Sequence, residues 1–99
     1  MAFPEGFEWD EVKRQANLSK HDIDFRDLWE MFERPVHEDY DHRHSGREDR
    51  WRVIGILHGR CVFCVYTWRD GRRRIVTVRQ ATRDESMLYF RYFWFEPLS

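Results

Sequence analysis

The stretch DHRHSGREDR, residues 41–50, holds the densest set of side chains that could move a proton or bind a charged group. Two histidines stand two positions apart at His42 and His44, and Glu48 and Arg50 follow them. Imidazole and carboxylate groups can serve as general acids and bases or as metal ligands, and arginine binds phosphate with a planar fork of donors. Three interpretations follow: a metal site, an acid–base centre, or a solvated loop between two folded pieces.

A metal site would need a fuller set of ligands than this stretch provides. His42 and His44 would point the same way on a strand, but no H-E-x-x-H helix completes a coordination shell. The other ligand types nearby in sequence are His37, Glu38, Asp39, Asp41 and His58. We therefore predict neither a bound metal nor any other cofactor.

The two cysteines, Cys61 and Cys64, form a C-x-x-C pair that could suggest zinc binding or redox chemistry. They lie inside the run RCVFCVYTW, which is typical of a strand. Side chains three positions apart on a strand point to opposite faces. We therefore expect two free thiols, with no bridge and no shared metal.

Metal-free cleavage of RNA requires groups that this chain does contain. In that reaction the 2′-hydroxyl of the RNA attacks the phosphate, a base takes its proton, an acid protonates the leaving oxygen, and cations stabilise the charge. The acid–base candidates are His44 and Glu48. The arginines that could hold phosphate are Arg50, Arg74, Arg79 and Arg83. Spacing alone leaves a solvated, arginine-rich sheet face as the alternative.

Charge is distributed unevenly along the 99 residues, although the formal net charge is only −1. Residues 1–45 carry 6 Lys and Arg against 12 Asp and Glu, and residues 46–99 carry 11 against 6. A cationic half built from arginine makes nucleic acid a candidate partner, unless the two halves neutralise each other in the fold. No apolar run approaches the ~20 residues of a membrane span, and the N-terminus resembles no signal peptide, so we expect a cytoplasmic protein.

The C-terminal run LYFRYFWFEPLS places six aromatic residues within seven positions. A single helix cannot bury all of them on one face, and a monomer seldom leaves such a patch in water. We therefore predict that this tail, residues 90–99, contacts a partner chain, with base stacking as the alternative. The residues expected to make that contact are Tyr92, Phe93, Trp94 and Phe95.

Two helices are predicted in the first third of the chain. Asp10 can cap a helix in which Val12, Ala16 and Ile23 mark the buried stripe, with Lys13, Arg14 and Lys20 outside. Asp24 can cap a second helix, which Pro35 ends. The buried positions expected in this second helix are Phe25, Leu28, Trp29 and Phe32.

A sheet and a last helix are predicted in the remainder. After a short strand around residues 36–40 come strands over 51–58, 61–68 and 72–81, joined by turns at Gly59-Arg60 and Asp70-Gly71. In the last strand, alternation puts Val76 and Val78 on one face and Arg79 on the other. The residues expected beside Arg79 are Arg73, Ile75 and Thr77.

The final helix is expected to be capped by Thr82 with Glu85 in a capping box. We expect one α+β domain over residues 1–99, with two N-terminal helices packed on one face of an antiparallel sheet of three or four strands, then a C-terminal helix.

Three segments together resemble the BrnT family of type II toxins: FEWDEVKRQANLSKHDIDF, DHRHSGREDRWRVIG and RRRIVTVRQATRDESMLY. The resemblance spans about residues 7–89, and several motifs in the same order are more specific than any one of them. The family's K…N…K-H helix is matched by Lys13, Asn17, Lys20 and His21. Its H-x…E-x-R segment is matched by His44, Glu48 and Arg50, and its last-strand motif runs from Arg74 through Arg79 and Thr82 to Glu85 and Tyr89.

The resemblance implies a RelE-like fold and a ribonuclease that cuts mRNA and inhibits translation. It also implies a BrnA-like antitoxin with a ribbon-helix-helix domain. The toxin would then contact operator DNA only through this antitoxin. Catalytic candidates are His44, Glu48, Arg50, Arg79, Lys20 and His21, and RNA-binding candidates are Arg74, Thr77 and Arg83. His21 could instead only cap the first helix.

The sequence departs from the family pattern at three positions. Thr77 stands in place of a serine, while Gln80 and Ser86 each stand in place of an arginine. Two expected cations are thus missing, which favours the alternative of a non-catalytic protein that binds an antitoxin and co-represses its operon. A metal-dependent nuclease is a third interpretation, which chelation would test.

Overall fold

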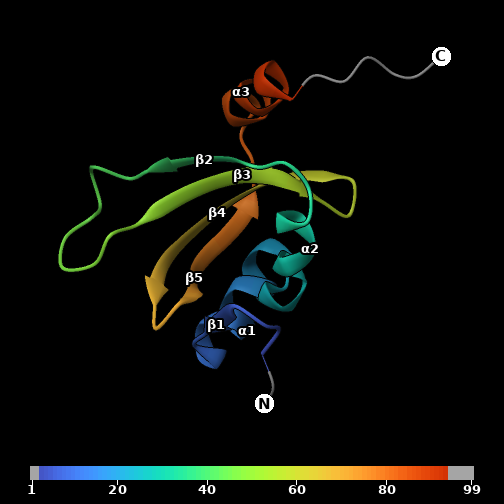
Figure 1. Ribbon diagram of the computed structural model, residues 1–99. Helices are drawn as coiled ribbons and strands as arrows, with labels where there is room; N and C mark the ends of the chain where they lie inside the picture. The colour runs from blue at the N-terminus through green and yellow to red at the C-terminus, as the bar shows by residue number, and fades with distance from the viewer. Residues whose placement is uncertain (1–2, 94–99) are drawn as a thin grey trace.

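The computed structural model describes residues 3–93, which form a five-stranded sheet with helices on both faces (Figure 1). The sheet order is β1-β5-β4-β3-β2, with β1 parallel to β5 and the other pairs antiparallel. The strands are β1 (Phe7–Trp9), β2 (His37–Tyr40), β3 (Trp51–Leu57), β4 (Arg60–Arg69) and β5 (Arg72–Gln80). The helices are α1 (Glu11–His21), η1 (a 3₁₀ turn, Phe25–Asp27), α2 (Leu28–Phe32) and α3 (Arg83–Tyr92).

The α+β class is confirmed, but the predicted arrangement was wrong in two respects. The sheet has five strands and is mixed, because the N-terminal residues Phe7–Trp9 pair in parallel with β5. The second helix is interrupted: Asp24 caps the 3₁₀ turn through the backbone N–H of Arg26, and α2 itself has only five residues. Pairing between residues about 66 positions apart leaves no mark on local spacing, so the parallel pairing of this segment could not be foreseen from pattern.

Two tight turns shape the three long strands. Both residues of each turn have positive φ: His58 and Gly59 at one hairpin, Asp70 and Gly71 at the other. Such turns match the right-handed twist of the strands that they join. The Asp70-Gly71 turn is as predicted, whereas the first turn is His58-Gly59, since Arg60 already pairs with Leu57.

The apolar core lies between one face of the sheet and the N-terminal helical segments. Phe25 and Leu28 are buried there as predicted, and Ile23 is buried beside them. Trp29 is instead 39% exposed. This face of the sheet is called the core face below.

The buried side of α1 is not the predicted one. Val12 is 78% exposed, whereas Arg14 and Asn17 are buried. Arg14 is turned inward because its guanidinium bonds Glu11 and Asp24, which ties α1 to the start of η1. Removing a charged guanidinium from water is unfavourable, and the two carboxylates compensate for it.

Asn17 explains why α1 lies against β5. Beyond Ile75 this strand has no β1 partner, and the Asn17 side chain takes over: its Oδ1 accepts from the Val78 backbone N–H at 3.2 Å and from the Thr77 hydroxyl at 3.1 Å. Its Nδ2 donates to the Ile23 carbonyl at 3.3 Å. One amide therefore pairs both with the open edge of the sheet and with the segment that follows α1.

A β-bulge in β5 decides which side chains leave the core face. Tyr66 pairs with Ile75 and Val65 pairs with Thr77, so Val76 has no partner. Ile75 and Val78, three apart, are consequently both buried in the core, and the predicted grouping of Val76 with Val78 was wrong. Arg73 also turns to the core face, where it stacks on the Phe32 ring at 4.3 Å.

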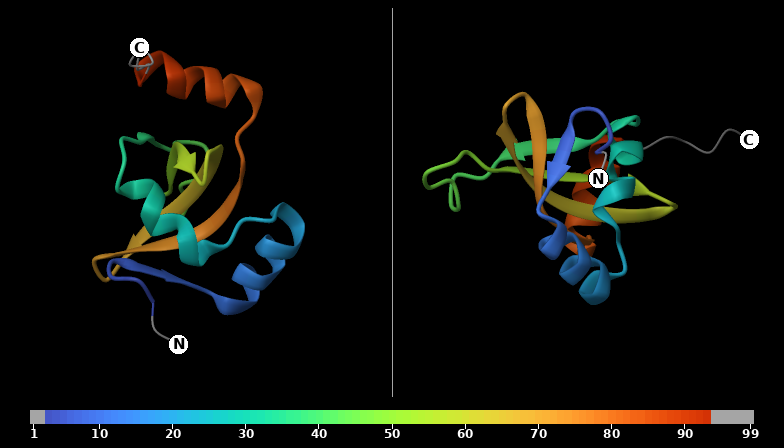
Figure 2. Two further views of the ribbon diagram at one scale, coloured as in Figure 1. Left: turned by 90° about the vertical axis from the view of Figure 1, so that its right-hand side faces the viewer. Right: turned by 90° about the horizontal axis from the view of Figure 1, so that it is seen from below.

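Helix α3 stands over the opposite face of the sheet, at its far end from the N-terminus (Figures 1 and 2). The predicted capping box is confirmed: Thr82 Oγ1 accepts from the Glu85 backbone N–H, and the Glu85 carboxylate accepts from the Thr82 N–H. Tyr89 is buried and donates to the Pro35 carbonyl at 2.9 Å.

Only part of the predicted aromatic tail belongs to the described residues. Tyr92 is 64% exposed and Phe90 is 42% exposed, while Phe93 is half-buried and its ring lies 4.9 Å from that of Tyr89. Trp94 and Phe95 lie outside the described residues. As expected, the rings of Phe90, Tyr92 and Phe93 are not all buried on one face of the helix.

Candidate functional site

A groove of about 410 Å³ lies on the sheet face opposite the core, between the loop that follows β2 and the start of α3. Both polar and apolar side chains line it. The apolar floor comes from β4 and β5, and the polar rim comes from the loop, β3 and α3. The lining residues are Asp41, His44, Arg50, Arg52, Phe63, Val65, Val76, Thr77, Arg79 and Glu85.

Arg79 is the most firmly held cation of the groove. Its guanidinium lies 4.1 Å from the centre of the Phe63 ring, which is its cross-strand neighbour on β4. It also donates from Nη1 and Nη2 to the two carboxylate oxygens of Glu85, at 2.8 and 3.0 Å. An arginine fixed by a ring below and a carboxylate at its fork is oriented to grip an oxyanion.

Glu85 is ionised in this arrangement. Burial raises the pKa of its carboxyl, but the hydrogen bonds from Arg79 and from the Thr82 backbone outweigh burial, so the pKa lies below its usual range. The same carboxylate therefore caps α3 and occupies the guanidinium fork of Arg79. Glu85 thus connects the start of α3 to the Arg79 guanidinium in the groove.

His44 lies at the rim of the groove and is held by Asp41. Its Nδ1 is 3.1 Å from Oδ2 of Asp41, and its backbone N–H donates to Oδ1 at 3.2 Å. The Asp41 side chain is 5% exposed and that of His44 is 64% exposed. The imidazole is therefore accessible to a substrate while the carboxylate behind it is not.

Arg50 supplies a cation that no carboxylate of the described chain engages. Its backbone is fixed, since its N–H donates to Ser45 Oγ at 2.9 Å and its carbonyl accepts from the Asp41 N–H at 2.8 Å. The guanidinium makes no ion pair with any residue between 3 and 93. Arg52, its neighbour in the groove, is paired with Asp39 at 2.8 Å.

The predicted site residues separate into two groups. His44, Arg50, Thr77 and Arg79 come together in the groove. Glu48 borders an adjacent hollow with His44 and Arg50, and its carboxylate accepts a hydrogen bond from Arg69. Those that do not line the groove are Lys20 and His21 at the end of α1, Arg74, which pairs with Glu8 at 3.5 Å, and Arg83.

Sequence reasoning missed three groove residues that the geometry makes prominent: Asp41, Phe63 and Glu85. Asp41 was weighed only as a metal ligand, although a D-x-x-H spacing in a turn is a signal for a carboxylate that contacts the histidine. Glu85 was assigned only to helix capping. Phe63 carried no local signal, since its contact with Arg79 depends on strand register.

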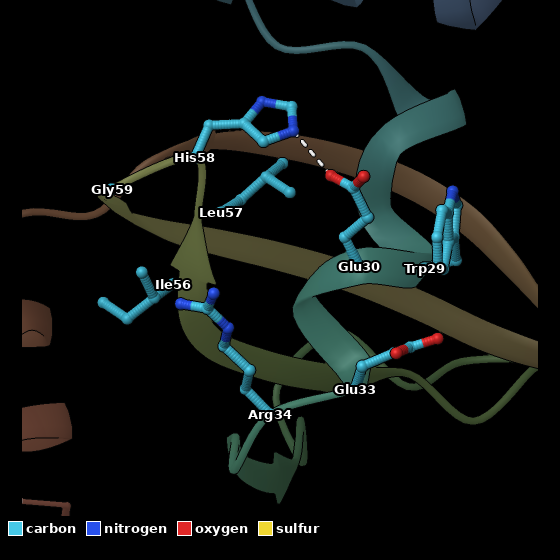
Figure 3. A pocket seen from close by; sticks show the side chains of 8 residues that line it. All are labelled: Trp29, Glu30, Glu33, Arg34, Ile56, Leu57, His58 and Gly59. Atoms are coloured by element: carbon cyan, nitrogen blue, oxygen red, sulfur yellow. Dashed lines mark hydrogen bonds and ion pairs between the residues drawn. The ribbon is translucent and has the colours of Figure 1, made fainter.

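A second hollow of about 420 Å³ lies at the edge of the core face, between α2 and the turn after β3 (Figure 3). Its histidine is already engaged, with Nε2 of His58 2.5 Å from Oε2 of Glu30. Glu30 and Glu33 make this rim anionic, with Arg34 as a single counter-charge. Phosphate would be repelled here, so the groove is the better candidate for a nucleic-acid site.

The cysteines behave as predicted, since both are free: Cys64 is fully buried and Cys61 is half-buried. Burial raises the pKa of both thiols, that of Cys64 to about 12. Within residues 3–93, no three His, Cys, Asp or Glu side chains gather closely enough to hold a metal ion. No helix in the same part of the chain is long and apolar enough to cross a membrane.

Comparison with known proteins gives one family. A family model described as the ribonuclease toxin, BrnT, of a type II toxin–antitoxin system matches residues 9–85. That range includes every residue that lines the groove. No curated protein matches the sequence.

Proposed function

Because the chain belongs to the BrnT family of ribonuclease toxins of type II toxin–antitoxin systems, we propose that it cleaves RNA in the groove between the sheet and α3. The observation that carries this proposal is the convergence of His44, Arg50 and Arg79 on one groove with an apolar floor. These are the groups that cleavage by the 2′-hydroxyl requires: a proton acceptor and cations that hold the phosphate.

The reaction can be written from these groups alone. Nε2 of His44 takes the proton of the 2′-hydroxyl, and the 2′-oxygen forms a bond to phosphorus. The bond from phosphorus to the 5′-oxygen breaks, and that oxygen receives a proton that the His44 imidazolium returns. The products are a 2′,3′-cyclic phosphate and a 5′-hydroxyl end.

The arginines stabilise the charge that builds up on the phosphate during this step. Arg79 offers a planar fork already aligned by Phe63, and Arg50 offers a second cation that has no carboxylate partner within residues 3–93. Glu48 is less suited to the proton transfer, because its carboxylate binds Arg69 outside the groove. Of the two acid–base candidates in the loop, we assign the role to His44.

The family implies an RNA substrate and a protein antitoxin. We propose that the substrate is mRNA in the cytoplasm, so that translation falls, and that a BrnA-like antitoxin covers the groove and carries the ribbon-helix-helix contacts to operator DNA. The exposed aromatic side chains of Phe90 and Tyr92, on the helix beside the groove, offer that antitoxin an apolar surface.

Purified protein incubated with RNA in EDTA tests the function. We expect cleavage that persists in chelator and yields cyclic-phosphate ends, and we expect His44→Ala to slow it by about 10²–10⁴-fold, with a residual rate that can still be measured. His42→Ala is the matched control, because His42 is exposed and packs on the Tyr40 ring away from the groove. Cleavage that EDTA abolishes would indicate a metal-dependent nuclease instead.

One observation favours the non-catalytic alternative, an antitoxin-binding co-repressor. The Arg79 fork already binds the Glu85 carboxylate, so a phosphate must displace an internal anion. If the wild-type protein cuts no RNA and causes no growth arrest, yet binds an antitoxin, this alternative replaces the ribonuclease proposal.

A further inference from the structure

Asp41 is the most buried ionisable residue of a loop that is otherwise open to solvent. It directly follows β2 and is 4% exposed, whereas His42, Arg43 and His44 are all exposed. Its backbone N–H donates to the Arg50 carbonyl at 2.8 Å, which fixes it at the base of the loop. A carboxylate kept from water in this way needs compensating donors.

The donors come from the loop itself. Oδ1 of Asp41 accepts from the backbone N–H groups of Arg43 and His44, both at 3.2 Å. Oδ2 faces Nδ1 of the His44 ring at 3.1 Å. Burial raises the pKa of Asp41, but the hydrogen bonds from His44 and Arg43 outweigh burial. The pKa of Asp41 therefore lies below its usual value.

An ionised carboxylate can only accept hydrogen bonds, so the ring nitrogen that faces it must carry a proton. In a neutral imidazole the proton is then on Nδ1, and Nε2 presents a lone pair. Nε2 of His44 has no hydrogen-bond partner within residues 3–93, and the ring borders the groove. The nitrogen that could receive a substrate proton is therefore the free one.

We propose that Asp41 is a positioning residue for RNA cleavage, which holds His44 in the Nδ1–H tautomer with Nε2 directed to the 2′-hydroxyl. This role rests on the proposed ribonuclease function. Asp41 does not touch the substrate itself, and it acts through His44. The same carboxylate stabilises the imidazolium that forms when Nε2 takes the proton.

The loop does not need this carboxylate for its closure. Ser45 closes it separately, with Oγ donating to the Asp41 carbonyl at 2.6 Å and accepting from the Arg50 N–H at 2.9 Å. Asp41→Asn keeps an oxygen for the two backbone N–H groups and turns an amide N–H₂ toward Nδ1. Nδ1 must then accept, the proton moves to Nε2, and the imidazole loses its free lone pair where the substrate lies.

Steady-state cleavage of one RNA oligonucleotide by Asp41→Asn tests the role. We expect kcat to fall by about 10²–10⁴-fold, the range of a lost general base, while KM stays within about twofold. In the His44→Ala background, Asp41→Asn should cause no further loss, because it acts only through the imidazole. Asp49→Asn is the matched control, since Asp49 lies in the same loop and accepts from the Tyr40 hydroxyl.

The tautomer of His44 gives a readout independent of activity and of how well any variant folds. Nitrogen-15 NMR of the wild-type protein should show the proton on Nδ1, and a proton on Nε2 overturns the inference. Full activity in Asp41→Asn, or equal losses from Asp41→Asn in both backgrounds, also overturns it while the ribonuclease proposal stands. A wild-type protein that cuts no RNA overturns the proposed function first, and the role of Asp41 with it.

Discussion

Arg79 and Glu85 hold each other by two parallel hydrogen bonds across the groove, at 2.8 and 3.0 Å. The arginine that we propose to bind the phosphate thus already binds an anion of the same chain. Because Glu85 lies in the first turn of α3, any ligand that takes its place on Arg79 also changes what holds the helix to the sheet. If RNA binds at Arg79 as proposed, the contact makes the affinity for RNA and the position of α3 interdependent.

Glu85→Gln should therefore tighten RNA binding. Glutamine retains an oxygen for the Thr82 N–H but no longer competes as an anion for Arg79. We expect KM to fall by about two- to fivefold, the factor that corresponds to the ~0.5–1 kcal/mol of a partly exposed ion pair. The slope of log affinity against log salt should steepen by about 0.7, since the Glu85 carboxylate no longer offsets the positive charge of Arg79.

Asp84→Asn is the control for this change, because Asp84 is exposed on the same helical turn and does not line the groove. Both variants remove one negative charge from α3. Equal effects of the two substitutions would mean that overall charge, and not release of Arg79, governs RNA affinity.

Arg79 itself should tolerate no replacement. Arg79→Ala removes the charge that faces the phosphate, and we expect kcat/KM to fall by about 10²–10³-fold, the usual loss for one oxyanion-stabilising donor. Arg79→Lys keeps the charge but loses the planar fork and much of the stacking on Phe63, so most of the loss should remain. If lysine restores wild-type rates, a point charge suffices and the bidentate geometry has no role in catalysis.

Arg50 offers a cleaner separation of binding from stability. Its guanidinium forms no ion pair in the described part of the chain, so Arg50→Ala should leave the melting temperature unchanged. RNA affinity should fall with a salt slope shallower by about 0.7. Arg72→Ala, at the exposed start of β5, is the control and should change neither quantity. Equal losses in both variants would point to a diffuse charge effect.

The features predicted correctly from sequence are those encoded within a few residues. Thr82 and Glu85 specify a capping box by their spacing alone, and Asp70-Gly71 specifies a hairpin turn by the φ values that these residues accept. His44 and Arg50 lie together at the groove because both belong to one short loop, which is closed by the hydrogen bond from the Asp41 N–H to the Arg50 carbonyl; their roles stay predictions.

The features that could not be predicted depend on register and on distant partners. Continued from the Asp70-Gly71 turn without a bulge, the pairing would set Arg79 opposite Val62, on the core face. The extra residue Val76 shifts the register by one, so that Arg79 meets Phe63 on the groove face. The prediction counted instead from Val76 and Val78, which it put together on one face. Counted in that way, simple alternation placed Arg79 on the correct side but assigned Val76 and Ile75 to the wrong sides.

The reversed face of α1 gives a stability prediction. Asn17→Ala should destabilise the protein by about 1–3 kcal/mol, because the Val78 N–H and the Ile23 carbonyl lose a buried partner. Urea unfolding measures it. Val12→Ala should leave the free energy of unfolding almost unchanged, because the Val12 side chain is 78% exposed. This substitution would matter if the predicted apolar stripe were buried. A larger loss from Val12 than from Asn17 would contradict the orientation of the helix.

The ion pairs of Arg14 predict how stability depends on acid. The hydrogen bond from Arg14 has the largest effect on the pKa of Glu11 and lowers it. Burial raises this pKa, and the hydrogen bond from the Trp9 indole N–H lowers it. Together these effects bring the pKa of Glu11 to about 2, from an ordinary 4.5. A carboxyl whose pKa is depressed in the folded state contributes stability that is present above its ordinary pKa and lost as the pH falls through the folded value. The free energy of unfolding should therefore decline between pH 5 and pH 2.

Arg14→Met tests whether this decline originates at the helix junction. The variant should be less stable at pH 7, because Glu11 and Asp24 lose their shared cation, and its unfolding free energy should vary less between pH 5 and pH 2. Lys13→Met removes one positive charge from the adjacent exposed position and should keep the wild-type pH dependence. Since Asp41 and Glu85 also have lowered pKa values, part of the decline should persist in Arg14→Met. An unaltered pH profile in Arg14→Met would show that the groove carboxylates, and not Glu11, carry the acid sensitivity.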